Sequence, residues 1–157
     1  YTQSGILNEA EMGRCLQVIG RDNARTPMQW TPGENGGFTT GTPWIDVNPN
    51  HTEINAQDQL ADPDSVFRYY QKLIRLRKEY PIIVHGDFHP LLEEDPHIYA
   101  YERRLDGARL LVLCSFAAGD VVCPLGEDGR GRLLLSNYPT HKAGLLQPYE
   151  ARALFYE

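Results

Sequence analysis

The stretch that decides how this sequence folds is Arg21-Asp22-Asn23-Ala24-Arg25-Thr26-Pro27-Met28-Gln29-Trp30. It opens a segment, residues 21–52, whose four prolines and four glycines predict an irregular loop. A loop of this length is uncommon in a compact domain and is usually functional. It carries Arg21 and Arg25, and a guanidinium offers a planar fork of hydrogen-bond donors. The stretch therefore predicts a binding loop.

Helical patterns flank this loop on both sides. A short, irregular helix is predicted for residues 6–19, a helical turn for 52–60, and a clear helix for 63–79. Asp62 is a suitable N-cap for the last of these, and Pro63 suits its first position. Its apolar residues recur at the helical period and form one stripe. These are Val66, Phe67, Tyr70, Leu73 and Ile74.

From residue 82 onward the pattern is that of short β-strands separated by turns. The predicted strands are 82–92, 97–105, 108–116, 120–125, 131–137 and 151–156. Asp106-Gly107 between two of them is a two-residue hairpin signal. Leu110 to Cys114 is apolar on both faces, which predicts a central strand. Strands at this spacing indicate a compact antiparallel sandwich.

Composition excludes several classes of partner and cofactor. Acidic residues outnumber basic ones by 21 to 15, for a net charge of -6, so neither nucleic acid nor an anionic membrane surface is an expected partner. The three cysteines stand far apart without a Cys/His cluster. We therefore expect no metal and no cofactor, and reduced thiols typical of a cytoplasmic protein.

The motifs of the loop resemble the alpha-amylase superfamily, in the branch of family 13 glycoside hydrolases that holds oligo-1,6-glucosidase, dextran glucosidase, trehalose-6-phosphate hydrolase and sucrose isomerase. The ten-residue run 21–30 is the most specific of them, and the resemblance weakens through the β region. The other matching segments are Gly37-Phe38-Thr39-Thr40-Gly41, Pro43-Trp44-Ile45-Asp46-Val47-Asn48-Pro49-Asn50, Asp62-Pro63-Asp64-Ser65-Val66-Phe67, Leu73-Ile74-Arg75-Leu76-Arg77, Ile98-Tyr99-Ala100-Tyr101 and Ser136-Asn137-Tyr138.

This resemblance implies an α+β piece of a larger enzyme. Residues 1–80 would be the C-terminal remnant of a (β/α)8 barrel, with 21–52 as the loop after strand eight and 63–79 as the last helix. Residues 81–157 would form an antiparallel β-sandwich domain. In the family, the first arginine of the motif helps to hold the terminal glucose of the substrate. That position is Arg21 here, with Arg25 as the rival, and Arg25 can instead form a buried ion pair with Asp22 or another acid of the loop.

The catalytic carboxylates of the family do not occur in this sequence. Retaining glycosidases need two carboxyl groups about 5–5.5 Å apart, and a whole barrel needs roughly 200–250 residues. The local acids Glu93-Glu94-Asp95 are a solvated turn, and His85 with His89 lacks a third metal ligand. Asp46, Asn48 and Asn50 lack the glycine and glutamate of a calcium loop. We therefore expect no catalytic residue in this chain, which is a fragment, a truncated frame or a processed piece of a retaining alpha-glucosidase that takes short oligosaccharides.

Two non-catalytic alternatives remain open from the sequence. The chain can be a stand-alone β-sandwich module that self-associates through the exposed stripe of helix 63–79, because large apolar patches mark interfaces. It can also be a carbohydrate-binding module that uses exposed tyrosines. The candidates for that platform are Tyr99, Tyr101, Tyr138 and Tyr149.

Overall fold

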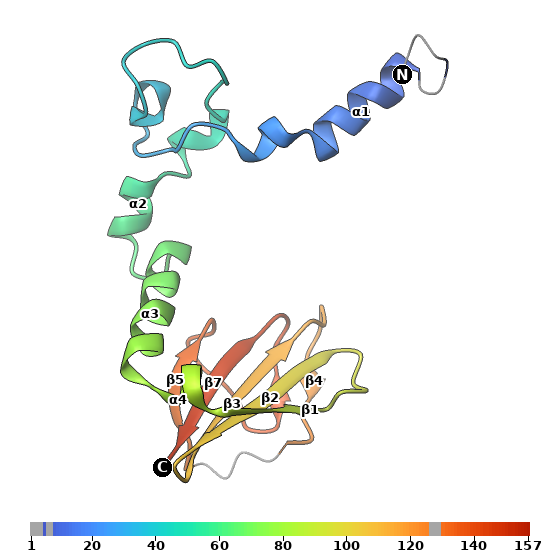
Figure 1. The fold of residues 1–157 in the computed structure, drawn as a ribbon, viewed down its shortest axis with the longest axis vertical. Helices are drawn as coiled ribbons and strands as arrows, with labels where there is room; N and C mark the ends of the chain where they lie inside the picture. The colour runs from blue at the N-terminus through green and yellow to red at the C-terminus, as the bar shows by residue number, and fades with distance from the viewer. Residues whose placement is uncertain (1–4, 6–7, 126–129) are drawn as a thin grey trace. The chain divides into compact units, whose positions relative to one another are not determined.

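The computed structural model describes residue 5 and the ranges 8–125 and 130–157 (Figure 1). The chain divides into two compact units, Tyr1–Arg68 and Tyr69–Glu157. The first is made of short helices and a long loop, and the second is built around an antiparallel sheet.

The first unit follows the predicted order of helix, loop and helical turn. The helix predicted at 6–19 is α1, Glu9–Ile19, and Asn8 begins it with a capping box, while residues 6 and 7 lie outside the described part. The loop predicted at 21–52 is interrupted by single 3-10 turns. The elements of this unit are η1 (Arg21–Ala24), η2 (Glu34–Gly37), η3 (Pro49–Thr52) and α2 (Ala56–Ala61).

Helix α3, Val66–Glu79, begins three residues later than predicted. The Asp62 carboxylate accepts a hydrogen bond from the Asp64 backbone N–H at 2.9 Å and so holds a local turn instead of capping the helix. Ser65 caps it instead, because its hydroxyl accepts from the Arg68 backbone N–H at 3.2 Å. The prediction of a helix was right, and its N-terminus was wrong.

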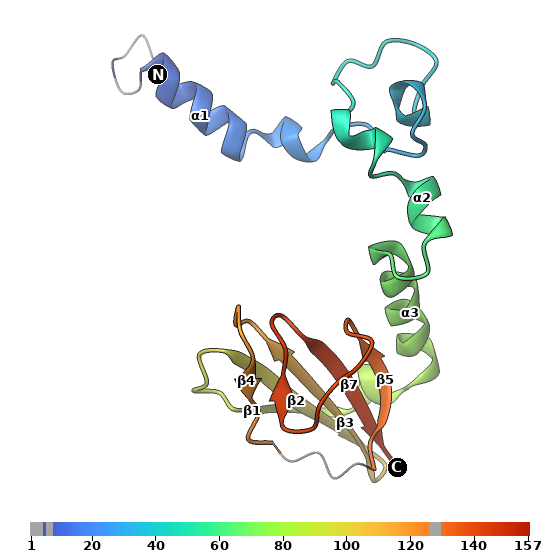
Figure 2. The same ribbon diagram turned by 180° about the vertical axis from the view of Figure 1, so that it is seen from behind.

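The second unit contains a five-stranded antiparallel sheet in the order β1-β2-β3-β7-β5 and a two-stranded ribbon, β4-β6 (Figure 2). The central strand is β3, as its apolar pattern predicted. Asp106 and Gly107 both have positive φ, 49° and 88°, as expected for the predicted hairpin turn. The bounds are α4 (Ile82–His85), β1 (Asp87–Leu91), β2 (Ile98–Leu105), β3 (Ala108–Ser115), β4 (Val121–Val122), β5 (Arg132–Ser136), β6 (Leu145–Leu146) and β7 (Ala151–Tyr156).

Two strand predictions need correction, and one strand was not predicted. Residues 82–85 of the predicted strand 82–92 form the helical turn α4, because Pro81 has helical φ and ψ and its carbonyl accepts from the N–H groups of Val84 and His85. His85 and His89 therefore do not share a strand face. The strand predicted at 120–125 is only the two residues of β4. Strand β6 was not predicted, because two leucines are too few to show alternation.

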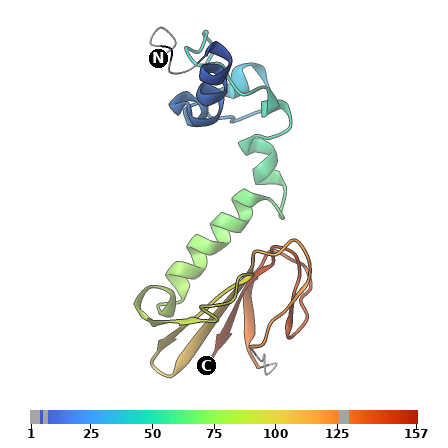
Figure 3. The ribbon, with the colours of Figure 1, turned by 90° about the vertical axis from the view of Figure 1, so that its right-hand side faces the viewer.

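The sheet has an apolar core on each face. On one face, Leu111 and Leu113 of β3 pack with Leu146 and Cys123 from the β4–β6 segment. On the other, Leu110 packs with Leu76 of α3, Ile82 of α4 and the β5 leucines 134 and 135. Figure 3 shows α4 and the segment of β4 and β6 on opposite sides of the sheet. The sheet is thus the middle layer of its unit.

A fully buried ion pair ties the segment before β7 to the sheet. Glu150 and Arg152 expose none of their side-chain surface, and Arg152 Nη1 lies 3.1 Å from Glu150 Oε1. Arg152 also donates to the backbone carbonyls of Lys142 and Leu145, at 3.1 and 3.2 Å. The second oxygen of Glu150 accepts from the Gln147 backbone N–H at 2.8 Å. Both charges are compensated by hydrogen bonds as well as by each other.

The packing of α3 on the sheet predicts that Leu76→Ala lowers the free energy of unfolding by about 2–3 kcal/mol, since it removes a buried side chain and leaves a cavity. The matched control is Leu73→Ala, because Leu73 lies on the same helix and is 38% exposed. That change should cost less than about 1 kcal/mol in this chain. Urea unfolding measures both. Equal losses would mean that Leu76 does not hold α3 on the sheet.

Candidate substrate-binding loop

Arg21 stands where α1 ends and the loop begins, and two neighbours fix this junction. The backbone N–H of Gly20 donates to the Leu16 carbonyl at 2.9 Å. The side-chain amide of Asn23 donates to the carbonyl of Gln17 at 2.6 Å. These bonds satisfy carbonyls that the end of a helix leaves unpaired. Asn23 therefore caps the C-terminal end of α1, next to Arg21.

The second arginine of the motif is engaged locally. Arg25 Nη2 forms an ion pair with Asp22 Oδ1, as the alternative assignment of Arg25 predicted. The pair is not buried, since the two side chains are 49% and 61% exposed. Arg21 is also exposed, but it makes no hydrogen bond or ion pair with any residue that the structure describes. Its donors are therefore available for a ligand.

The loop beyond the arginines is held by a network of backbone hydrogen bonds. The N–H of Trp30 donates to the Gly36 carbonyl at 2.8 Å, and the carbonyls of Gln29 and Trp30 accept from residues 56 and 57 at 2.9 and 3.0 Å. Gly36 is buried with φ 62°, and a Cβ there would lie 3.3 Å from Val47 Cγ1. Glycine is needed at this position for both reasons. The network keeps the loop in one shape without a hydrophobic core.

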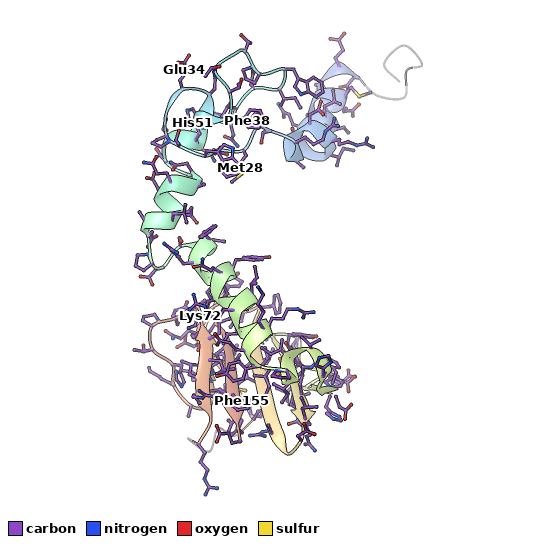
Figure 4. All side chains as sticks on the ribbon, turned by 60° about the vertical axis from the view of Figure 1, so that its left-hand side comes forward. Met28, Glu34, Phe38, His51, Lys72 and Phe155 are labelled. Atoms are coloured by element: carbon purple, nitrogen blue, oxygen red, sulfur yellow. The ribbon has the colours of Figure 1, made fainter. Side chains whose placement is uncertain are left out.

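Apolar side chains of this unit point outward. Met28 is 49% and Phe38 51% exposed, and both are labelled on the loop in Figure 4. Trp30 is 52% exposed, and Trp44 is 86% exposed. Met28 and Trp30 are therefore not buried by packing within this unit.

Two acids of the first unit are engaged by neighbouring side chains. Asp22 is paired with Arg25, and Asp58 accepts from the Asn55 amide at 2.7 Å. Across the residues that the structure describes, no group of three or more His, Cys, Asp and Glu side chains could hold a metal ion. Of the helices in the described part, none is long and apolar enough to cross a membrane.

The junction at Gly20 gives a test of how Arg21 is positioned. A Cβ on Gly20 would lie 2.3 Å from the Leu16 carbonyl oxygen, a backbone atom that moves only if the helix end moves. We expect Gly20→Ala to open this junction and to speed amide hydrogen exchange at positions 20–23. Gly33→Ala is the control, because a Cβ there would meet no atom closer than 3.4 Å. Unchanged exchange in Gly20→Ala would contradict the tight contact.

Comparison with known proteins identifies the family of the chain. The family model described as alpha amylase, catalytic domain, matches residues 1–86. The chain belongs to the alpha-amylase family. It is 53% identical over 159 residues to an oligo-1,6-glucosidase of Halalkalibacterium halodurans, covering 94% of this chain and 28% of that protein. It is 43% identical over 160 residues to a trehalose-6-phosphate hydrolase of Bacillus subtilis, covering 96% and 28%.

Solved structures of this family share the fold of the chain. The crystal structure of Bacillus licheniformis trehalose-6-phosphate hydrolase superposes with a TM-score of 0.85 at 40% identity, over 98% of this chain and 29% of that one. A trehalulose synthase, MutB, gives a TM-score of 0.87 at 36% identity, over 99% and 30%. The chain thus spans less than a third of the length of these relatives, which are enzymes that act on sugars.

Sequence reasoning missed the residues that position the arginines. Gly20 directly follows the last apolar residue of a predicted helix, which is a C-terminal signal that could have marked it. The cap by Asn23 has no such signal, because its carbonyl partner lies six residues back on a helix that the sequence defines weakly.

Proposed function

We propose that this chain is the C-terminal part of a retaining alpha-glucosidase that cleaves short alpha-glucosides. Residues 1–80 complete its catalytic barrel with the loop 21–52 and the last helix, and residues 81–157 form an antiparallel β-sandwich domain. The observation that carries the proposal is the exposure of the apolar side chains in the first unit. No large apolar side chain is buried among its described residues. The exposed ones include Leu16, Ile19, Met28, Trp30, Phe38, Trp44, Ile54 and Leu60.

A unit of this kind needs a partner to cover it. Folded domains bury their apolar faces in a shared core, and the two hydrophobic clusters of this chain both lie in the second unit. Residues 1–86 match a catalytic-domain model, so the partner that buries these apolar side chains is the rest of that domain. The exposed side chains are then barrel contacts.

Helix α3 supports the same assignment. Leu76 is buried against the sheet, whereas Tyr70 is 64% and Ile74 54% exposed on another face of the helix. An amphipathic helix in water has one apolar stripe, and a second one calls for a second partner. The remainder of the barrel is that partner in our proposal.

The chemistry of the site is divided between this chain and the rest of the enzyme. Two carboxyl groups from other barrel strands act as nucleophile and acid/base, about 5–5.5 Å apart. Arg21 donates hydrogen bonds to the glucose at the cleaved bond or to a carboxylate that orients it. Arg25 is the second candidate for sugar contact, although its pair with Asp22 favours a structural role.

The names of the relatives indicate the substrate class. They comprise oligo-1,6-glucosidases, a trehalose-6-phosphate hydrolase and MutB, one of whose crystal structures holds the substrate sucrose. All of these names point to short alpha-glucosides, which supports a small oligosaccharide as the ligand of this enzyme. The free thiols of Cys15 and Cys114 support a reducing, cytoplasmic location as part of the same proposal.

Comparing this chain with the complete enzyme tests the proposal, where the complete enzyme is the polypeptide in which the chain follows the rest of the barrel. The complete enzyme should hydrolyse a chromogenic alpha-glucoside with retention at the anomeric carbon, and the 157-residue chain should not. If the 157-residue chain alone hydrolysed the substrate faster than its Arg21→Ala variant, the site would not be divided between this chain and the rest of the enzyme. Inversion at the anomeric carbon would overturn the retaining mechanism.

The second candidate function is a non-catalytic module that self-associates through helix 63–79, and the exposed stripe favours it. Val66 is 70% exposed, and Phe67, Tyr70, Leu73 and Ile74 follow it on the helix with 38–64% exposure. Sedimentation velocity of the chain at increasing concentration separates the two candidates. Dimers that dissociate in the variant Tyr70→Glu, together with an inactive complete enzyme, would favour the module.

A further inference from the structure

A pocket of about 470 Å3 lies within the second unit, at the edge of the sheet that β1 and β2 form (Figure 1). Three aromatic side chains line it, namely Phe88 on β1, Tyr99 on β2 and Phe116 just after β3. They are 50%, 52% and 68% exposed. A volume of this size is within the range of small-molecule sites, about 300–1,000 Å3. We call this hollow the edge pocket.

The aromatic rings of the edge pocket are held by neighbouring rings and by backbone hydrogen bonds. The ring centroid of Tyr101 lies 5.1 Å from that of Phe88 and 5.8 Å from that of Tyr99. The backbone N–H of Phe116 donates to the His97 carbonyl at 2.8 Å, which places Phe116 beside the start of β2. Side chains that are already fixed lose little conformational entropy when a ligand binds.

The rim of the edge pocket is the loop between β1 and β2, which hydrogen bonds hold in one turn. The Asp95 backbone N–H donates to the Leu92 carbonyl at 2.9 Å, and Asp95 Oδ1 accepts from the backbone N–H groups of His97 and Ile98, both at 2.9 Å. Leu92 adopts a φ of 55°, which is unfavourable for a bulky residue and is found where surrounding contacts impose it. The rim is therefore formed before any ligand arrives.

The charged groups of the edge pocket are carboxylates. Glu93 and Asp95 line it, and Glu93 makes no hydrogen bond or ion pair with any residue that the structure describes. The described lining contains no Lys or Arg. An ionised carboxylate only accepts hydrogen bonds, so this lining suits a ligand with many hydroxyl donors and disfavours an anion. A pyranose fits both parts, because its C–H faces stack on aromatic rings while its hydroxyls donate to the rim.

We infer that the edge pocket is a sugar-binding site of the β unit that takes a short, uncharged alpha-glucoside chain. The ligand class rests on the proposed function, whereas the pocket belongs to the second unit alone. Leu76 of α3 packs with Leu110 of β3 and with the β5 leucines 134 and 135, so its contacts lie away from the β1–β2 edge. Glucosides held there raise the concentration of substrate around the enzyme.

Titration of the 157-residue chain with isomaltotriose, followed by NMR of the backbone amides, tests the inference. Amide signals within residues 92–99 and that of Phe116 should shift and saturate. Tyr99→Ala and Phe116→Ala should each raise the Kd about fivefold or more, because a stacking ring is lost. Tyr70→Ala is the matched control, since Tyr70 is 64% exposed on α3 and does not line the pocket. It should leave the Kd unchanged.

Three outcomes of this titration would overturn the inference. The first is the absence of shifts at the pocket, including the case where only the loop 21–52 responds. The second is an equal response to sorbitol, which has hydroxyls but no ring face to stack. The third is a stronger response to glucose 6-phosphate than to glucose, because the carboxylates of Glu93 and Asp95 should disfavour the phosphate.

Electrophoresis of the complete enzyme in gels that contain dextran, an alpha-linked glucan, gives a second readout. Dextran should retard the enzyme, and Tyr99→Ala should reduce this retardation while hydrolysis of a chromogenic alpha-glucoside is retained. Equal retardation of the enzyme and of Tyr99→Ala would mean that glucan does not reach the pocket, and would overturn the site. Retardation that depends on Tyr99 in an enzyme without glucosidase activity would contradict the proposed function and leave the sugar site standing.

Discussion

We expect kcat/KM of the complete enzyme for short alpha-glucosides to fall about 100- to 10,000-fold when Arg21 is replaced by Ala. Two charge-assisted hydrogen bonds of about 1.5–3 kcal/mol each would be lost, and each 1.36 kcal/mol corresponds to tenfold in rate. The exposed guanidinium of Arg21 has no partner among the described residues, so none of these residues competes for its donors. Steady-state kinetics on a chromogenic alpha-glucoside measures the loss.

Two further variants make this test specific. Arg21→Lys should recover little of the rate, because an ammonium cannot donate through a planar fork. Arg25→Ala should cost less than tenfold, since its ion pair with Asp22 is exposed and exposed pairs contribute at most about 1 kcal/mol. A twofold or smaller effect of Arg21→Ala would remove this residue from the site. A larger loss in Arg25→Ala than in Arg21→Ala would transfer the role to Arg25.

The second large effect is expected at the buried ion pair. Glu150→Ala should lower the free energy of unfolding by about 3–5 kcal/mol, because it leaves the fully buried guanidinium of Arg152 without its counter-charge. The change also removes the acceptor of the Gln147 backbone N–H. Urea unfolding of the 157-residue chain, followed by tyrosine fluorescence, measures the loss.

Two controls separate charge from packing at this pair. Glu150→Gln keeps an acceptor for Gln147 and should cost less than Glu150→Ala. The double change Glu150→Leu with Arg152→Met should recover most of the stability, since an apolar replacement of a buried pair is often neutral. If the double variant were as unstable as Glu150→Ala, the loss of stability would come from lost packing and not from the unpaired charge of Arg152.

The fold could be predicted where the local sequence pattern agrees with the tertiary environment of the same residues. The run Leu110 to Cys114 is apolar on both faces because β3 lies between two cores, and Asp106-Gly107 turns because both residues adopt positive φ. The pattern failed at 82–85, where three consecutive β-branched residues form a helical turn. There a backbone turn set by Pro81 and the burial of Ile82 outweigh β-propensity.

The candidate site was predicted less completely than the fold. The arginines stand in a specific motif, so their positions could be read directly, and the pair of Arg25 with Asp22 is confirmed. The roles of Gly20 and Asn23 could not be predicted, because they depend on the contacts of these residues with backbone atoms of α1. The role of Arg21 toward a sugar stays a prediction.

The packing of helix α3 on the sheet determines where chimeras of such enzymes are best joined. A chimera joined just after Glu79 would take the sheet from one parent and Leu76 from another, so Leu110 and Leu134 would meet a foreign side chain. A junction within residues 62–65 would transfer the helix together with its sheet, through a turn whose hydrogen bonds are local. The useful crossover point therefore precedes the helix, even though the change from helix to strand lies some twenty residues further on.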